Sequence, residues 1–183
     1  MKFVELPLVG AYLVRLEQRL DDRGFFARTF CADEFAEHGL PAEFPQQSLA
    51  RSRRAGTLRG MHLQLEPHAE DKLVRCVRGR IFDAIVDLRP ASATYLRSAS
   101  VELDEEKGDA LFVPAGFAHG YQTLRDDTDV LYAMSARYAP AAARSMRWND
   151  PAMNIAWPIG EPILSDADRN APGLDAFLRE RGA

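Results

Sequence analysis

Long hydrophobic runs are missing from this 183-residue sequence, which nowhere approaches the ~18 consecutive apolar residues that a membrane-spanning helix needs. The N-terminal segment MKFVELPLVG also lacks the apolar stretch of a signal peptide. We therefore expect a protein that neither spans nor is bound to a membrane, located in the cytoplasm.

Cysteine is equally scarce. Cys31 and Cys76 are the only two, and they show neither a C-x-x-C motif nor the spacing of a zinc finger. This excludes a disulfide framework and a structural zinc site built on cysteine pairs. We expect both to behave as small buried hydrophobic residues.

Lysine is rare as well, because only Lys2, Lys72 and Lys107 are lysines among 23 basic residues and the other 20 are arginines. The net charge of −4 disfavours a nucleic-acid partner, which would call for a basic surface. Arginine binds phosphates and carboxylates in a planar, bidentate manner. The composition thus favours a small phosphorylated ligand.

What the sequence does contain is a series of short alternating segments between turn residues, from Tyr12 to about Tyr138. Valine, isoleucine, phenylalanine and tyrosine at alternate positions predict half-buried antiparallel strands. Helices are expected only over Ala32–His38 and Leu174–Glu180, and 148–166 reads as a long ordered loop. We predict a mainly β sandwich, jelly roll or barrel, with residues 1–183 forming one domain.

The most specific motif runs from Gly108 to His119 and fits G-x5-P-x-G-x2-H. It resembles the second motif of the cupins, small jelly-roll barrels with an interior ligand site. Metal-binding cupins carry a second histidine in the first motif, where this sequence has Gln64 after His62. Two histidines are too few for a typical catalytic metal site, so we expect neither metal nor cofactor.

Several polar residues are expected on strands whose neighbours are apolar. Arg59 lies three positions before His62, and a bulge at Gly60 would turn both side chains to the same face. Lys72 precedes an apolar run. Each residue alone is compatible with a purely structural role, and only their combination points to chemistry.

Seven segments, in this order and at these distances, resemble the dTDP-4-dehydrorhamnose 3,5-epimerases, a family of metal-free cupins. They are DDRGFFARTF, GTLRGMHLQ, DKLVRCVRGRIFDAIVDLR, FVPAGFAHG, the strand with Tyr132, RWNDPAMNIAWP and PILSDAD. The similarity extends from about residue 2 to about residue 170. It implies a cupin-type double-stranded β-helix (jelly roll) and an isomerase that acts on a nucleotide-activated 4-keto-6-deoxysugar.

The resemblance implies catalytic roles for four residues. His62 would be the base, Tyr132 the acid on the opposite face of the sugar, and Lys72 the cation beside the developing enolate. Asp168 would pair with His62, fixing its tautomer and stabilising the imidazolium. Such a set fits the chemistry, because protons at C3 and C5 are acidified by the C4 carbonyl and inversion needs an acid and a base on opposite faces.

Substrate-binding roles follow from the same resemblance. Arg23 and Arg59 would hold the diphosphate and nearby groups, His119 the sugar, and Tyr138, six residues after Tyr132 on the same strand face, the nucleotide base. The remaining expected binding residues are Gln47 and Asp83.

Other positions differ from the family pattern, among them Arg28, Ala167 and the stretch 46–50. These differences leave open epimerisation at C3, C5 or both, a single-site epimerase or ketoisomerase on a GDP- or CDP-linked sugar, and a non-catalytic sugar-nucleotide binding module. Family members exchange N-terminal strands, and VGAYLVRL would otherwise leave an unpaired strand edge, so we expect a homodimer.

Overall fold

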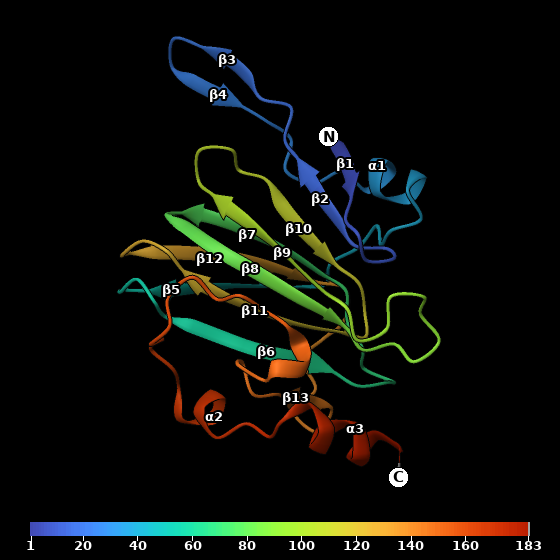
Figure 1. Cartoon of the computed structure of the whole chain (residues 1–183). Helices are drawn as coiled ribbons and strands as arrows, with labels where there is room; N and C mark the ends of the chain where they lie inside the picture. The colour runs from blue at the N-terminus through green and yellow to red at the C-terminus, as the bar shows by residue number, and fades with distance from the viewer. Residues whose placement is uncertain (183) are drawn as a thin grey trace.

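The computed structural model describes residues 1–182 and consists mainly of two antiparallel β-sheets that face each other (Figure 1). The six-stranded sheet has the order β1 (Lys2–Glu5), β2 (Tyr12–Arg15), β10 (Ala110–Val113), β7 (Lys72–Arg78), β12 (Thr128–Met134) and β5 (Gln46–Ser52). The five-stranded sheet has the order β13 (Ala143–Ser145), β6 (Leu58–Gln64), β11 (Phe117–Thr123), β8 (Arg80–Asp87) and β9 (Ser98–Asp104). The predicted mainly β architecture is confirmed.

The helices are few and short. The two predicted helices are present as α1 (Ala32–Glu37) and α3 (Leu174–Gly182). The expected loop 148–166 contains a 3-10 turn, η1 (Pro151–Met153), and leads into α2 (Asp166–Arg169), which the sequence did not predict. None of the helices described is long and apolar enough to span a bilayer.

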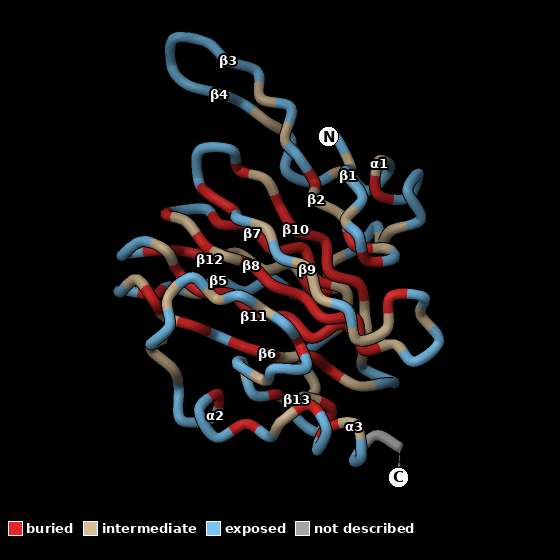
Figure 2. The backbone as a smooth tube through the Cα atoms, in the orientation of Figure 1, coloured by how far each residue is buried: buried red, intermediate tan, exposed pale blue. Residues whose placement is uncertain are grey.

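The core lies between the two sheets, where the inward-facing residues of both pack together, as the buried segments in Figure 2 show. It is formed by Leu8, Ala11, Val74, Cys76, Ile81, Ile85, Leu103, Leu111, Val113, Phe117, Tyr121 and Val130. Strand alternation explains this directly, because every second side chain points to the same face.

The outer face of the five-stranded sheet is covered by the C-terminal part of the chain. Met61 and Leu63 of β6 are buried there with Leu174 and Phe177 of α3. His62 stands between Met61 and Leu63, so its side chain points the other way, into the interior. The apolar contacts on the outside thus fix the direction of a polar residue on the inside.

One expectation about strand edges is wrong. Segment 9–16 was expected to leave an unpaired edge, but β2 lies inside the sheet, paired with β1 on one side and β10 on the other. What protrudes instead is a hairpin of β3 (Arg19–Asp21) and β4 (Gly24–Phe26), which extends away from the sheets (Figure 1). It pairs only within itself among the described strands.

At the end of β8, the buried carboxylate of Asp87 organises the following loop. It accepts hydrogen bonds from Arg89, from Ser92 Oγ at 2.5 Å and from Thr94 Oγ1 at 2.7 Å. Burial alone would raise the pKa of Asp87, but these hydrogen bonds outweigh it and lower the pKa to about 2.

This depressed pKa predicts a specific acid sensitivity. The Asp87 contribution to stability is complete above the ordinary pKa of 3.8 and is lost as the pH falls towards 2. We expect Asp87→Asn to lower the free energy of unfolding at pH 6 and to flatten its decline between pH 4 and 2. Urea unfolding at several pH values measures both, with the exposed Asp22→Asn as control. An unchanged slope would contradict this role.

Candidate active site

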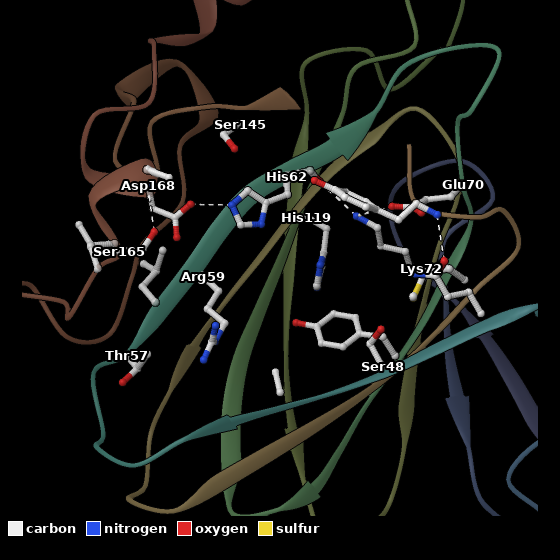
Figure 3. Close-up of a pocket in the computed structure, with 18 of the residues that line it drawn as sticks. Ser48, Thr57, Arg59, His62, Glu70, Lys72, His119, Ser145, Ser165 and Asp168 are labelled. Carbon is white, nitrogen blue, oxygen red and sulfur yellow. Dashed lines mark hydrogen bonds and ion pairs between the residues drawn. The ribbon is translucent and has the colours of Figure 1, made fainter. Parts of the chain in front are cut away.

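A cavity of about 820 Å³ opens between the two sheets (Figure 3). Its wall combines basic, acidic, hydroxyl and apolar side chains from both sheets and from 163–168. The lining residues are Gln46, Ser48, Ala50, Thr57, Leu58, Arg59, His62, Glu70, Lys72, His119, Tyr132, Met134, Tyr138, Ser145, Ile163, Leu164, Ser165, Ala167 and Asp168. Seven of the ten predicted site residues, which lie far apart in the sequence, line this cavity.

His62 and Asp168 form a short hydrogen-bonded pair at the cavity wall. His62 Nε2 lies 2.6 Å from Asp168 Oδ1, and Figure 3 shows the contact crossing from β6 to α2. Ser165 caps α2 by accepting a hydrogen bond from the Asp168 backbone N–H, which fixes the position of the carboxylate. Burial alone would raise the pKa of Asp168. The hydrogen bond with His62 and the electrostatic attraction to it outweigh burial, so the pKa of Asp168 is lowered. The pair therefore favours a charged carboxylate that orients the imidazole.

Gly60 makes it possible for Arg59 and His62 to face the same cavity. Between β6 and β11, His119 pairs with His62 and Tyr121 with Arg59, so three steps on β6 match two on β11. Gly60 has φ +140°, and a Cβ there would lie 2.5 Å from the Cα of Gly120. Only glycine fits this close approach. The predicted irregularity at Gly60 is confirmed.

Lys72 enters from the opposite sheet, at the start of β7. Its side chain is almost fully buried, and its Nζ donates to the backbone oxygen of His62 at 3.3 Å and lies 3.4 Å from Glu70 Oε1. Burial lowers the pKa of Lys72, and the negative charge of Glu70 partly counteracts this shift. The ammonium thus sits in a water-poor site where its charge acts strongly.

Tyr132 also comes from the six-stranded sheet, from the middle of β12, so it lines the wall that faces His62 of β6. Its ring lies 6.0 Å from that of His119 on the facing sheet. Burial raises the pKa of Tyr132 well above its ordinary value, which keeps the phenol protonated at neutral pH. The His62 imidazole and the protonated Tyr132 phenol therefore line the same cavity from opposite walls.

His119 and Asp83 form a second, deeper pair. His119 Nε2 lies 2.6 Å from Asp83 Oδ1, and both side chains are buried. His119 lines the cavity, whereas Asp83 lies behind it. Asp83 orients His119 and in turn gains the hydrogen-bonding partner that a buried carboxylate needs.

Tyr138 reaches the cavity by a route that the sequence did not predict. It was expected on the same strand face as Tyr132, but β12 ends at Met134. Tyr138 lies on the following segment, where its backbone N–H donates to Gln46 Oε1 at 3.0 Å and its side chain is mostly exposed at the rim. The expected strand position is wrong, although the residue lines the cavity.

Arg23 and Gln47 lie outside the cavity of this chain. Arg23 is at the tip of the protruding hairpin, 90% exposed and paired with Asp21 at 2.5 Å. Gln47 points away from its neighbours Gln46 and Ser48, because alternate residues of β5 face opposite sides. It lines a separate cavity of about 160 Å³. Their roles in substrate binding stay predictions.

Sequence reasoning missed Glu70, whose side chain is 10% exposed. A signal was available, because Glu70 stands two positions before the lysine that was singled out. Gln64, noted only as a replaced histidine, accepts a hydrogen bond from the Ala139 N–H at 2.6 Å and donates to Glu70. Among residues 1–182, no group of three or more His, Cys, Asp or Glu side chains is arranged to hold a metal ion.

Comparison with known proteins assigns the chain to a family. The model of the dTDP-4-dehydrorhamnose 3,5-epimerase family matches residues 5–176. The chain belongs to this family. A dTDP-4-dehydrorhamnose 3,5-epimerase from Sinorhizobium fredii is 41% identical over 95% of this chain and 90% of the relative. The chain is therefore a sugar epimerase of the dTDP-4-dehydrorhamnose 3,5-epimerase family.

Solved structures agree with this assignment. A dTDP-4-dehydrorhamnose 3,5-epimerase from Bacillus anthracis, with TDP and PPi bound, superposes with a TM-score of 0.92 at 38% identity, covering 94% of this chain and 99% of that one. A 3'-monoepimerase from Streptomyces bikiniensis, in complex with dTDP-quinovose, gives a TM-score of 0.89 at 36% identity, covering 96% and 89%. The epimerase family and its cupin-type jelly roll, both predicted from the sequence, are confirmed.

Proposed function

We propose that this epimerase inverts C3, C5 or both in a nucleotide-activated 4-keto-6-deoxysugar of the dTDP-4-dehydro-6-deoxyglucose type, for deoxysugar or polysaccharide biosynthesis. The observation that carries the proposal is the His62–Asp168 pair at 2.6 Å in one cavity with Tyr132 and Lys72. His62 and Tyr132 belong to different sheets. A sugar ring bound between the sheets would therefore have the His62 imidazole on one face and the Tyr132 phenol on the other.

Proton removal is the first step. With Nε2 held by Asp168, the Nδ1 atom of His62 is the nitrogen that takes the proton from the carbon next to the ketone. The imidazolium that forms is stabilised by the ionised Asp168 carboxylate, as in other oriented histidine bases.

The resulting enolate carries its charge on the C4 oxygen. Lys72 lies within a buried part of the cavity wall and His119 beside Tyr132, so both can stabilise this oxygen. Arg59 adds a cation that neutralises the substrate phosphates. No metal or cofactor takes part in the proposed route.

Proton return completes the inversion. The Tyr132 phenol gives its proton to the opposite face of the same carbon, and the raised pKa of Tyr132 keeps it protonated until then. Afterwards the His62 imidazolium releases its proton to solvent, and the Tyr132 phenolate takes up a proton from solvent.

A panel of dTDP-, GDP- and CDP-linked 4-keto sugars in heavy water, followed by NMR, tests the reaction and the nucleotide together. We expect deuterium and inversion at C3, C5 or both with the dTDP sugar. Turnover only of a GDP- or CDP-linked sugar would identify the alternative substrate. Binding without deuterium at either carbon would identify a non-catalytic binding module and overturn the proposal.

For Lys72→Ala we expect a loss of about 10²-fold or more in kcat and a small change in KM, because the enolate charge exists only near the transition state. Steady-state kinetics measure both parameters. Lys107→Ala, which removes a largely exposed lysine, is the matched control. A change confined to KM would assign Lys72 to substrate binding instead.

We further propose a homodimer assembled through the β3–β4 hairpin. Its apolar residues Leu20, Phe25 and Phe26 are 77%, 49% and 73% exposed, which is costly for a hairpin that stays in water. In a dimer, a hairpin that reaches across would bring Arg23 to the cavity of the second copy. Light scattering of the wild type and of Phe26→Ser tests this, and a monomeric wild type would contradict it.

Two broader expectations are also proposals. We place the enzyme in the cytoplasm, since Cys31 and Cys76 are both free, as is usual in a reducing compartment. We treat residues 1–183 as one catalytic domain, a view supported by the core that both sheets share.

A further inference from the structure

Glu70 is an acidic residue of the cavity wall to which the proposed reaction assigns no task. Its side chain is 10% exposed, as is that of Lys72, and Oε1 lies 3.4 Å from Lys72 Nζ. Figure 3 shows Glu70 and Lys72 together at one end of the cavity, on the other side of His62 from Asp168. A nearly buried carboxylate this close to a nearly buried ammonium is a charge pair shielded from solvent.

Gln64 fixes the second oxygen of Glu70. The Gln64 amide nitrogen donates to Glu70 Oε2 at 3.0 Å, and also to the backbone oxygens of His68 and Arg137. Its amide oxygen accepts from the Ala139 N–H at 2.6 Å. Because Gln64 is buried and satisfied on both ends, the Glu70 carboxylate cannot swing away from Lys72 without breaking these contacts.

Without Glu70, burial would dominate the environment of the Lys72 ammonium. Lys72 stands opposite Val113 of β10 and Met134 of β12 in the sheet, and burial lowers its pKa. A neutral amine could neither stabilise an enolate nor donate as strongly to the C4 oxygen.

We propose that Glu70 is a positioning residue that keeps Lys72 protonated and directs its ammonium into the cavity. The proposal rests on the role given to Lys72 in the proposed function. Glu70 itself does not touch the reacting carbons; it acts through Lys72. The contact with Glu70 explains how a nearly buried lysine is kept as a cation.

Other charged or titratable groups surround the same cavity. On the cavity wall they are Arg59 and His62 on β6, His119 on β11, Tyr132 on β12 and the more distant Asp168 on α2. Asp83 on β8 lies behind the wall and also acts on the charge of Lys72. Asp83 favours the ammonium from a greater distance, and Glu70 is the stronger of the two influences. Glu70 is also the only carboxylate among the described residues that forms an ion pair with Lys72.

The scarcity of lysine makes a direct measurement feasible. Only Lys2, Lys72 and Lys107 would give side-chain signals in protein labelled with ¹⁵N-lysine, and Lys72→Arg assigns the one of interest. Titration of the full chain by NMR, without substrate, then follows the charge of Lys72 independently of catalysis. The variants are Glu70→Gln, which removes the charge at nearly constant shape, and Glu70→Asp, which keeps it.

We expect Glu70→Gln to lower the titration midpoint of Lys72 by about one pH unit or more, the size of effect that a close opposite charge produces. Glu70→Asp should restore part of the shift. Glu66→Gln, which removes an exposed charge from the same loop, should leave the midpoint unchanged. An unchanged midpoint in folded Glu70→Gln would overturn the proposal.

Activity gives a second, separable readout. The alkaline limb of the kcat profile should move to lower pH in Glu70→Gln, with kcat partly recovered at lower pH, while KM changes little. A uniform loss of kcat at every pH, with an unchanged Lys72 midpoint, would mean a merely structural role and overturn the proposal. If the wild type itself shows no exchange, the proposed function fails, yet the Lys72 titration still decides the role of Glu70.

Discussion

Replacement of His62 by alanine is expected to lower deuterium exchange at both C3 and C5 by about 10³-fold or more, because the proposed base for proton removal is lost. The side chain projects into the cavity from a strand whose outward neighbours, Met61 and Leu63, are buried under α3. Removing an inward imidazole that is 42% exposed leaves those contacts in place, so the fold should persist. NMR in heavy water measures the exchange and thermal unfolding checks the fold.

The exposed His68 provides the matched control, since His68→Ala removes an imidazole a few residues away and should leave exchange unchanged. Asp168→Asn should give a smaller loss than His62→Ala, because the base is kept but loses its oriented, charge-stabilising partner. Near-normal exchange in folded His62→Ala would remove His62 from the role of base.

Tyr132→Phe is expected to separate the two halves of the reaction. Proton removal by His62 needs no phenol, so exchange should continue at a reduced rate. Inversion should fall by about 10²-fold or more at the carbon that Tyr132 reprotonates, since general acid catalysis is lost there. The ratio of deuterated but uninverted substrate to inverted product, measured by NMR, reports this separation.

The volume of the ring is kept in Tyr132→Phe, so packing against His119 changes little. Tyr95→Phe removes a phenol from a loop that does not line the cavity and serves as the control. If exchange and inversion fell by the same factor in Tyr132→Phe, the residue would shape the cavity rather than donate the proton.

Much of the site could be predicted because it lies on regular strands. The glycine at position 60 predicted a bulge that turns Arg59 and His62 to the same face, and both line the cavity. The motif that ends at His119 predicted a residue of the interior ligand site, and His119 of β11 lines the cavity. In each of these places, local pattern and tertiary structure agree.

Other parts depend on geometry that local pattern does not contain. Tyr138 was given a strand position because periodicity was extended past Met134, where β12 ends. Gln47 faces the wrong side for this cavity because a shift of one residue along β5 changes the face. Asp168 could be chosen only by family resemblance, since α2 is four residues long and has no periodicity to read.

The contacts of Glu70 and the pairing of β2 could not be predicted because they depend on segments that are far apart in the sequence or belong to different sheets. The contact of Glu70 with Gln64 and Lys72 joins a loop to two strands of different sheets, which only the folded chain brings together. Likewise, segment 9–16 looked like a free edge in sequence, but β10, nearly 100 residues later, covers it. Long-range pairing decides both cases.

The most direct measurement is a single turnover of the wild-type enzyme with dTDP-4-dehydro-6-deoxyglucose in heavy water, with the deuterium content of each carbon read from the product. If His62 and Tyr132 act on opposite faces of the sugar, as proposed, every inverted carbon should carry a solvent deuterium after one turnover. An inverted C3 or C5 that retains its original hydrogen would contradict proton exchange between two separate groups.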